Sequence, residues 1–275
     1  MNKKSPSWKF ILLILFNIAA IAAFAVYVLN LQYNIFSKID YNKTEYLKPS
    51  PHYYKNPNIG LEKVLARVFL FEPNDINAEL QEDWRGGIET VFNKIQTVHK
   101  EQFFDLSNIE YIIYPEIIKG DFPSEYYDKE VLKFDSGKDE KQLNLIMDEI
   151  NERIKNKELN KINLEKYNYN YLANQIFYFG SNKFGDDNVS IAGYTNEERN
   201  SNSSILFWRP LSRQDVHVKA TIIYHEILHT LGVPEGYTYD DFTPFVDDIM
   251  GMGAISNRPI EINYLSNEFK KEMGL

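Results

Sequence analysis

The longest apolar run lies near the N-terminus, where residues 10–29 read FILLILFNIAAIAAFAVYVL and Asn17 is the one strongly polar position. A helix of this length, at about 1.5 Å per residue, covers the roughly 30 Å hydrocarbon core of a bilayer. Lysines stand before it at positions 3, 4 and 9. The pattern predicts a transmembrane signal-anchor, with residues 1–9 in the cytoplasm and the rest of the chain outside it. A cleaved signal peptide, which would make the protein secreted, is the alternative, because Ala23-Phe24-Ala25 fits the small-x-small cleavage pattern.

Residues 30–60 have no apolar period and contain prolines at positions 49, 51 and 57, which favours an extended stalk. From 61 to 275, apolar runs typical of strands alternate with helical periods, and we expect one domain. The predicted strands are 65–71, 109–114 (stopped by Pro115), 175–179, 189–194 and 204–208; the predicted helices are 79–98, 138–157, one that ends at Gly232, and 264–273. This order indicates an α+β fold with a mixed twisted sheet packed against helices.

Charge and composition argue against several kinds of partner and site. The formal net charge is -9 and the pI is near 5.2, so no basic surface is available to neutralise phosphates, and we expect no nucleic-acid partner. The chain contains no cysteine. Disulfides, thiolate metal ligands and a cysteine nucleophile are therefore excluded.

The candidate metal-binding and catalytic residues lie in the predicted helix that ends at Gly232. Ser212 and Asp215 have the spacing of a capping box, and an apolar stripe then follows at Val216, Ala220, Ile223, Ile227 and Leu231. Within this helix, His225 and His229 are one turn apart on one face, so their imidazoles can converge on one zinc ion. Glu226 is placed to act as the general base toward a water at the metal. Two core histidines are the alternative, but the Glu between them favours the metal site.

The residues after the helix carry a family resemblance. HEILHTLGVPE, with the downstream segment Asp248-Ile249-Met250-Gly251, resembles the metzincin zinc metalloproteases. The resemblance implies a third ligand three residues after Gly232, which is Glu235 here, and a methionine turn beneath the metal with Met250 as its thioether floor. It also implies that an edge strand, either 189–194 or 204–208, binds an extended peptide above the active-site helix.

Glu235 departs from the family, which generally has His or sometimes Asp at this position. A carboxylate is a competent zinc ligand, and Gly232 and Pro234 favour the short turn that would deliver it. Two alternatives stay open: the ligand is one of the acids at positions 240, 241 and 247, or a remote Glu, at 261 or 268, completes a thermolysin-like site.

We therefore expect a membrane-anchored, extracytoplasmic zinc metalloprotease that hydrolyses peptide bonds in a protein or peptide substrate. In this interpretation His225, His229 and Glu235 bind Zn²⁺, and Glu226 is catalytic. The alternative from a different class is a catalytically silent binding module on a protease fold. Such a module would have no need of Glu226, so the intact motif disfavours it.

Overall fold

A computed structural model describes residues 48–77, 84–135, 144–181, 193–195, 202–236, 247–253 and 258–275 of the 275-residue chain. The compact unit described here begins at Pro49 and ends at Leu275. The predicted cytoplasmic segment 1–9, the predicted anchor 10–29 and the first part of the predicted stalk lie outside the described residues. Among the residues that are described, no helix is both long enough and apolar enough to span a bilayer.

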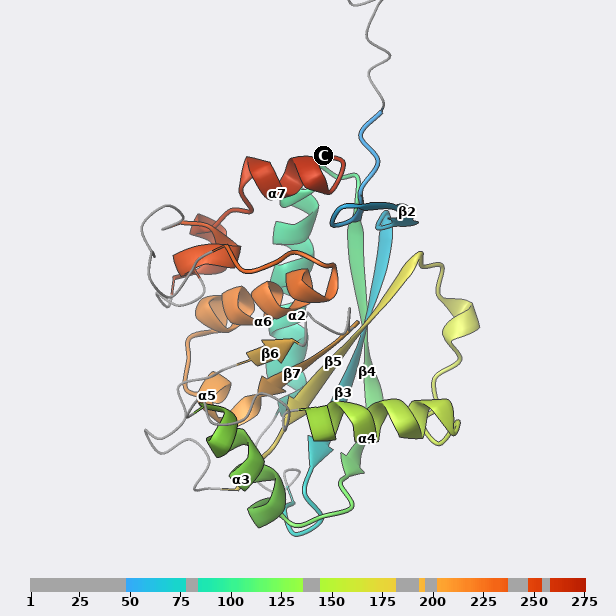
Figure 1. Ribbon diagram of the computed structural model, residues 1–275, viewed down its shortest axis with the longest axis vertical. Coiled ribbons are helices and arrows are strands. Elements are labelled where there is room, and N and C mark those ends of the chain that lie inside the picture. The colour runs from blue at the N-terminus through green and yellow to red at the C-terminus, as the bar shows by residue number, and fades with distance from the viewer. Residues whose placement is uncertain are drawn as a thin grey trace, which may run out of the picture. The chain divides into compact units, whose positions relative to one another are not determined.

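A five-stranded sheet with the strand order β4-β3-β5-β7-β6 is the centre of this unit (Figure 1). Strand β3 (Lys63–Glu72) pairs in parallel with β4 (Asn108–Lys119) on one side and β5 (Tyr171–Tyr178) on the other. Strand β7 (Ser203–Phe207) continues the parallel part, and the short edge strand β6 (Gly193–Thr195) runs antiparallel to β7. The sheet is therefore mixed but mostly parallel, and the expected mixed sheet with helices is confirmed.

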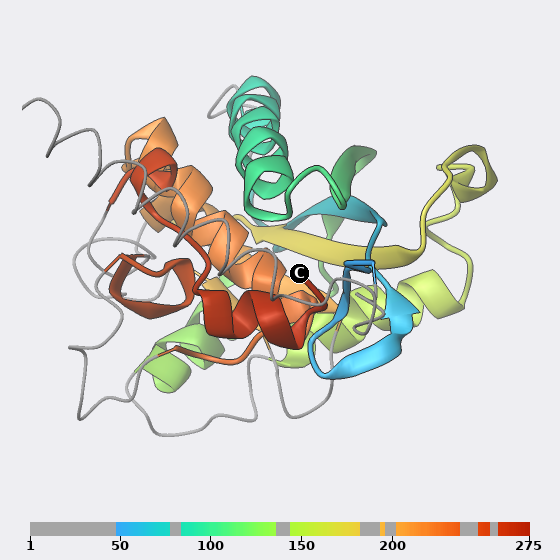
Figure 2. The same ribbon diagram turned by 90° about the horizontal axis from the view of Figure 1, so that it is seen from above.

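Helices cover both faces of the sheet (Figure 2). Helices α2 (Trp84–Gln102) and α6 (Val216–Thr230) pack on one face, and α3 (Ser124–Asp135) and α4 (Asn144–Lys155) lie on the other. Strand β3 supplies apolar side chains to both layers: Val68 joins the core under α2 and α6, whereas Phe69 joins the second core. Burial on both faces explains the continuous apolar run of β3, which is typical of a central parallel strand.

The remaining elements are short. They are β1 (His52–Tyr53), β2 (Asn56–Gly60), the 3-10 helices η2 (Leu164–Lys166) and η5 (Ile260–Ile262), α5 (Trp208–Ser212), the turn η4 (Ile249–Gly253) and α7 (Asn267–Glu272). The predicted C-terminal helix 264–273 thus exists as the shorter α7.

Residues 49–60 differ from the extended stalk that their prolines favour. Strands β1 and β2 pair as an antiparallel hairpin. Its backbone is bound to the end of the chain, because the amides of Ser50 and His52 donate to the carbonyls of Gly274 and Met273 at 3.0 and 2.9 Å. These two partners near the end of the chain lie more than two hundred positions away, where local sequence patterns give no signal.

The predicted end of the second strand at Pro115 is wrong, since β4 continues to Lys119. Proline removes one backbone donor, and this can be tolerated in β4 because it is an edge strand. The pairing register of β3 with β4 shifts between Val68 and Leu70, beside the proline. The helix α3 has no counterpart among the predicted elements.

Candidate metal centre

Helix α6 presents the two histidines and has well-defined ends. The Asp215 side chain caps its first turn by accepting from the backbone amide of His217 at 2.9 Å. Ser212 belongs to the preceding helix α5, so the capping box predicted from Ser212 and Asp215 is wrong and Asp215 alone is the cap. The helix ends at Thr230, and Gly232 follows with φ 87°. This left-handed conformation, which favours glycine, reverses the chain so that residues 233–235 return beside the helix end.

The side chains of His225, His229 and Glu235 converge at this reversal. The two Nε2 atoms are 3.0 Å apart. Glu235 Oε1 lies 3.3 Å from Nε2 of His229 and 3.5 Å from Nε2 of His225. Both histidines are buried, while the Glu235 side chain is 38% exposed. The group is therefore reachable from solvent on the Glu235 side, and it could hold a metal ion.

Backbone carbonyls determine which nitrogen of each imidazole faces this centre. Nδ1 of His225 lies 2.8 Å from the carbonyl oxygen of Ile249, and Nδ1 of His229 lies 2.8 Å from that of Val233. A carbonyl only accepts, so each Nδ1 must carry the proton and donate it. In the neutral form, both Nε2 lone pairs then point toward the shared centre, as in many metal-ligating histidines.

The centre is electrostatically suited to a cation. Two facing lone pairs 3.0 Å apart, with a carboxylate oxygen beside them, repel one another unless positive charge lies between them. Burial lowers the pKa of His225, but the Glu235 carboxylate more than offsets this, and the net shift is upward. Burial likewise opposes ionisation of Glu235, yet hydrogen bonds from both histidines, which form when Nε2 is also protonated, hold its pKa below the usual range. The same field that attracts a proton attracts a metal ion.

The distances allow a geometric test against zinc. Ligand atoms about 2.0–2.1 Å from a tetrahedral zinc ion lie roughly 3.3 Å from one another. The three observed separations are 3.0, 3.3 and 3.5 Å. The two imidazoles and the carboxylate therefore fit such an ion, and a tetrahedral ion would keep its fourth position for water or substrate.

Glu226 lies next to the first histidine but turns toward the sheet edge. Its Oε2 accepts a hydrogen bond from the Thr195 hydroxyl of β6 at 2.7 Å. Burial raises the pKa of this carboxyl, and the neighbouring histidines and Thr195 only partly offset the rise. A carboxylate with a raised pKa accepts a proton more readily, which suits a general base.

The turn η4 lies behind the histidines and is fixed by a buried acid. Asp248 accepts from the backbone amide of Met250 at 2.9 Å and from that of Ser266 at 3.2 Å. Asp248 and Met250 are fully buried. The turn thereby presents the Ile249 carbonyl to His225, so its contribution to the site includes a backbone acceptor as well as the methionine that the sequence singled out.

Other candidate ligands have different partners. Asp247 forms an ion pair with Arg258, and Glu261 pairs with Lys94 at 3.1 Å and with Nδ1 of His217 at 2.5 Å. The acids at positions 240 and 241 lie outside the described residues. Glu268 is in the first turn of α7 and is not part of the converging group.

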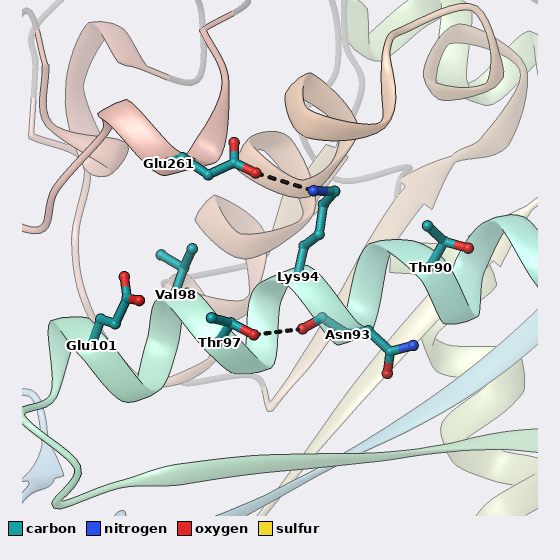
Figure 3. Close-up of a pocket in the computed structure, with 7 residues that line it drawn as sticks. All are labelled: Thr90, Asn93, Lys94, Thr97, Val98, Glu101 and Glu261. Carbon is teal, nitrogen blue, oxygen red and sulfur yellow. Dashed lines mark hydrogen bonds and ion pairs between the residues drawn. The ribbon is translucent and has the colours of Figure 1, made fainter.

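A surface hollow on α2 is separate from this centre (Figure 3). It contains the Lys94–Glu261 pair and the side chain of Thr97, which donates to the backbone carbonyl of Asn93. None of the converging metal-site residues lines it. The Lys94 and Glu261 side chains in this hollow are thus engaged with each other, and those of Thr90 and Thr97 are engaged with the helix backbone.

One of the two strands predicted to bind a peptide does lie at the sheet edge. The edge position belongs to β6, which overlaps the predicted strand 189–194, whereas 204–208 corresponds to β7 inside the sheet. Thr195 and the carbonyls of Ile249 and Val233 were missed by sequence reasoning. No residue type or spacing marks a backbone acceptor, and Thr195 is far from Glu226 along the chain.

Comparisons with known proteins add no family. No protein-family model matches this chain, and no curated protein is significantly similar to it.

Proposed function

We propose that this chain is a zinc-dependent peptidase of metzincin-like design, in which His225, His229 and Glu235 hold the metal. The observation that carries the proposal is the convergence of two Nε2 atoms and one carboxylate oxygen at separations of 3.0–3.5 Å, with a buried Glu226 directly beside them. The resemblance of HEILHTLGVPE and the DIMG turn supports the same conclusion. Two histidines buried for packing alone would not require a carboxylate aimed at both Nε2 atoms.

Each residue of the site has a distinct role in the proposed reaction. A zinc ion held here would supply Lewis acidity, polarising the scissile carbonyl and making water a stronger nucleophile near neutral pH. Glu226 accepts the proton of the attacking water and can return it to the departing amine. The Ile249 and Val233 carbonyls keep both imidazoles in the tautomer that offers Nε2. No side chain of the site needs to become covalently attached to the substrate.

An extended peptide is the substrate class that fits the site. Strand β6 is an edge of the sheet and lies beside α6 (Figure 1). Its outer backbone groups can pair with a substrate backbone by strand addition. We also propose that the apolar segment 10–29 anchors the protein in a membrane, with the peptidase unit outside the cytoplasm.

Metal content tests the site, and Glu226 separates binding from catalysis. The full chain, purified in detergent, should bind about one zinc ion, and either His225→Ala or His229→Ala should abolish stoichiometric binding. Glu226→Gln should retain the zinc but lose hydrolysis of a casein-type substrate by several orders of magnitude, because an amide cannot accept the proton. Zinc that stays bound in both histidine variants would contradict the proposal.

Glu235 needs its own comparison. Glu235→Ala should weaken zinc binding strongly, whereas Glu235→His should restore a three-imidazole site with more net positive charge. Asp247→Ala is the matched control, because Asp247 pairs with Arg258 and should not affect the metal. If the control releases zinc while Glu235→Ala does not, a different acid completes the centre. A protein that binds zinc and cleaves no peptide would favour the silent binding module instead.

A further inference from the structure

Two residues of the edge strand contact the side chain of Glu226. The Thr195 hydroxyl donates to Oε2 at 2.7 Å, and Thr195 is buried. Gly193 approaches from the same strand so closely that an added Cβ would lie 2.5 Å from Cγ and 2.6 Å from Oε1 of Glu226. Such distances are shorter than any normal contact, so only glycine leaves room for this carboxylate.

The hydroxyl has a second acceptor within reach, and the distances rank the two. The backbone carbonyl of Glu226 lies 3.4 Å from Thr195 Oγ1, compared with 2.7 Å for the carboxylate. A hydrogen bond to a charged oxygen is the shorter and stronger kind. One oxygen of Glu226 is thus held by β6, and the other is left for a proton from water.

A glutamate side chain has several rotatable bonds, and fixing it costs conformational entropy. Helix α6 fixes the Glu226 backbone, but it does not select one carboxylate position. The contacts with Gly193 and Thr195 do, because one removes space and the other adds a directed bond. This arrangement couples the carboxylate to the strand that forms the sheet edge.

We infer that Thr195 is a positioning residue that fixes the Glu226 carboxylate in one position beside the metal centre, in space that Gly193 leaves open. The inference rests on the proposed peptidase function and deepens it. The strand whose outer edge would pair with a peptide is also the strand that orients the general base. A peptide that shifts β6 therefore shifts the base with it.

The test compares Thr195→Val with Thr195→Ser in the full zinc-loaded chain. Valine keeps the shape and removes the donor, so kcat should fall about 10- to 100-fold, the scale of a misplaced catalytic group. KM and the zinc content should stay near the unmutated values, because Thr195 is not one of the three candidate ligands. Serine keeps the hydroxyl and should restore most of kcat. Gly193→Ala should also lower kcat while zinc remains bound.

A measurement without catalysis tests the contact itself. In a double-mutant cycle on metal-free protein, Thr195→Val and Glu226→Leu should be non-additive by about 10-fold in the unfolding equilibrium constant. Additive effects would overturn the inference, as would a kcat of Thr195→Val within twofold of the unmutated protein, or a Thr195→Ser variant as impaired as Thr195→Val. If the unmutated protein binds zinc yet cleaves no peptide, the peptidase proposal fails, and the cycle still decides whether Thr195 holds Glu226.

Discussion

Gly232 is the position where a single methyl group should do most damage to the metal centre. Its φ of 87° costs an L-residue with a side chain about 1–2 kcal/mol. An alanine Cβ would also lie 2.3 Å from Cε1 of the Tyr53 ring, so this ring must shift. Overpacking of this kind costs typically 1–3 kcal/mol. Together these terms predict that Gly232→Ala lowers the free energy of unfolding by about 2–5 kcal/mol.

Gly274 provides a matched control for this prediction. It also follows a helix, has φ 79°, and an added Cβ would lie 2.3 Å from the carbonyl oxygen of Ser50. Gly274→Ala should therefore destabilise the protein by a similar amount. Only Gly232 precedes the residues that complete the centre, Val233 and Glu235. Gly232→Ala, unlike Gly274→Ala, should therefore also weaken zinc binding by the protein molecules that stay folded.

Urea unfolding of metal-free protein measures the first effect, and zinc titration below the unfolding transition measures the second. For a unit of this size, the expected loss corresponds to a fall in Tm of roughly 5–15 °C. Neutral surface substitutions change the free energy of unfolding by no more than about 0.5 kcal/mol. A change this small for Gly232→Ala would refute the reasoning. Equal loss of zinc affinity in both variants would refute the claim that the Gly232 turn delivers the ligand.

Two further predictions concern buried groups near α6. Burial lowers the pKa of His99 to about 3. As the pH falls below about 6.5, His99 therefore becomes protonated in the unfolded chain before it does so in the folded protein. This difference should lower the free energy of unfolding by about 1.4 kcal/mol per pH unit between pH 6 and 4. His99→Gln should flatten this slope in urea unfolding measured at several pH values. Asp248→Asn should lower the free energy of unfolding by about 1–3 kcal/mol, because the NH₂ group of Asn then faces the backbone amide of Met250 or Ser266, and both groups are donors. Zinc titration of the same variant should show about 10-fold weaker binding. Asp247→Asn should change neither quantity, and an equal effect there would contradict this assignment.

The strongest periodic signals of the sequence correspond to real elements. The buried run 65–71 lies within β3, and the apolar stripe before Gly232 lies on α6. Both patterns are local consequences of burial, on two faces of a strand and on most of a helix. The convergence of His225 and His229 follows in the same way from helical spacing, which needs no tertiary information.

The missing parts depend on partners distant in sequence. The hairpin at 52–60 is held by residues 272–274, and β4 runs through Pro115 because it lies at the sheet edge. Strand direction was likewise not predicted, since a continuous apolar run indicates burial on both faces but does not determine the direction of each neighbouring strand, and β6 pairs antiparallel to β7. At the site, Thr195 reaches Glu226 from another element, and the acceptors for both histidines are backbone carbonyls, which every residue has.

The hydrogen bonds between the hairpin and the chain end have a consequence for biosynthesis. The amide of Tyr54 donates to the carbonyl of Leu231, and its neighbours Ser50 and His52 bind Gly274 and Met273. A ribosome releases the hairpin more than two hundred residues before its partners at 273 and 274. The ligand-bearing turn after α6 therefore gains its full support only when nearly the whole unit has emerged. A nascent chain that still lacks residues 273 and 274 should therefore bind metal more weakly than the complete folded unit.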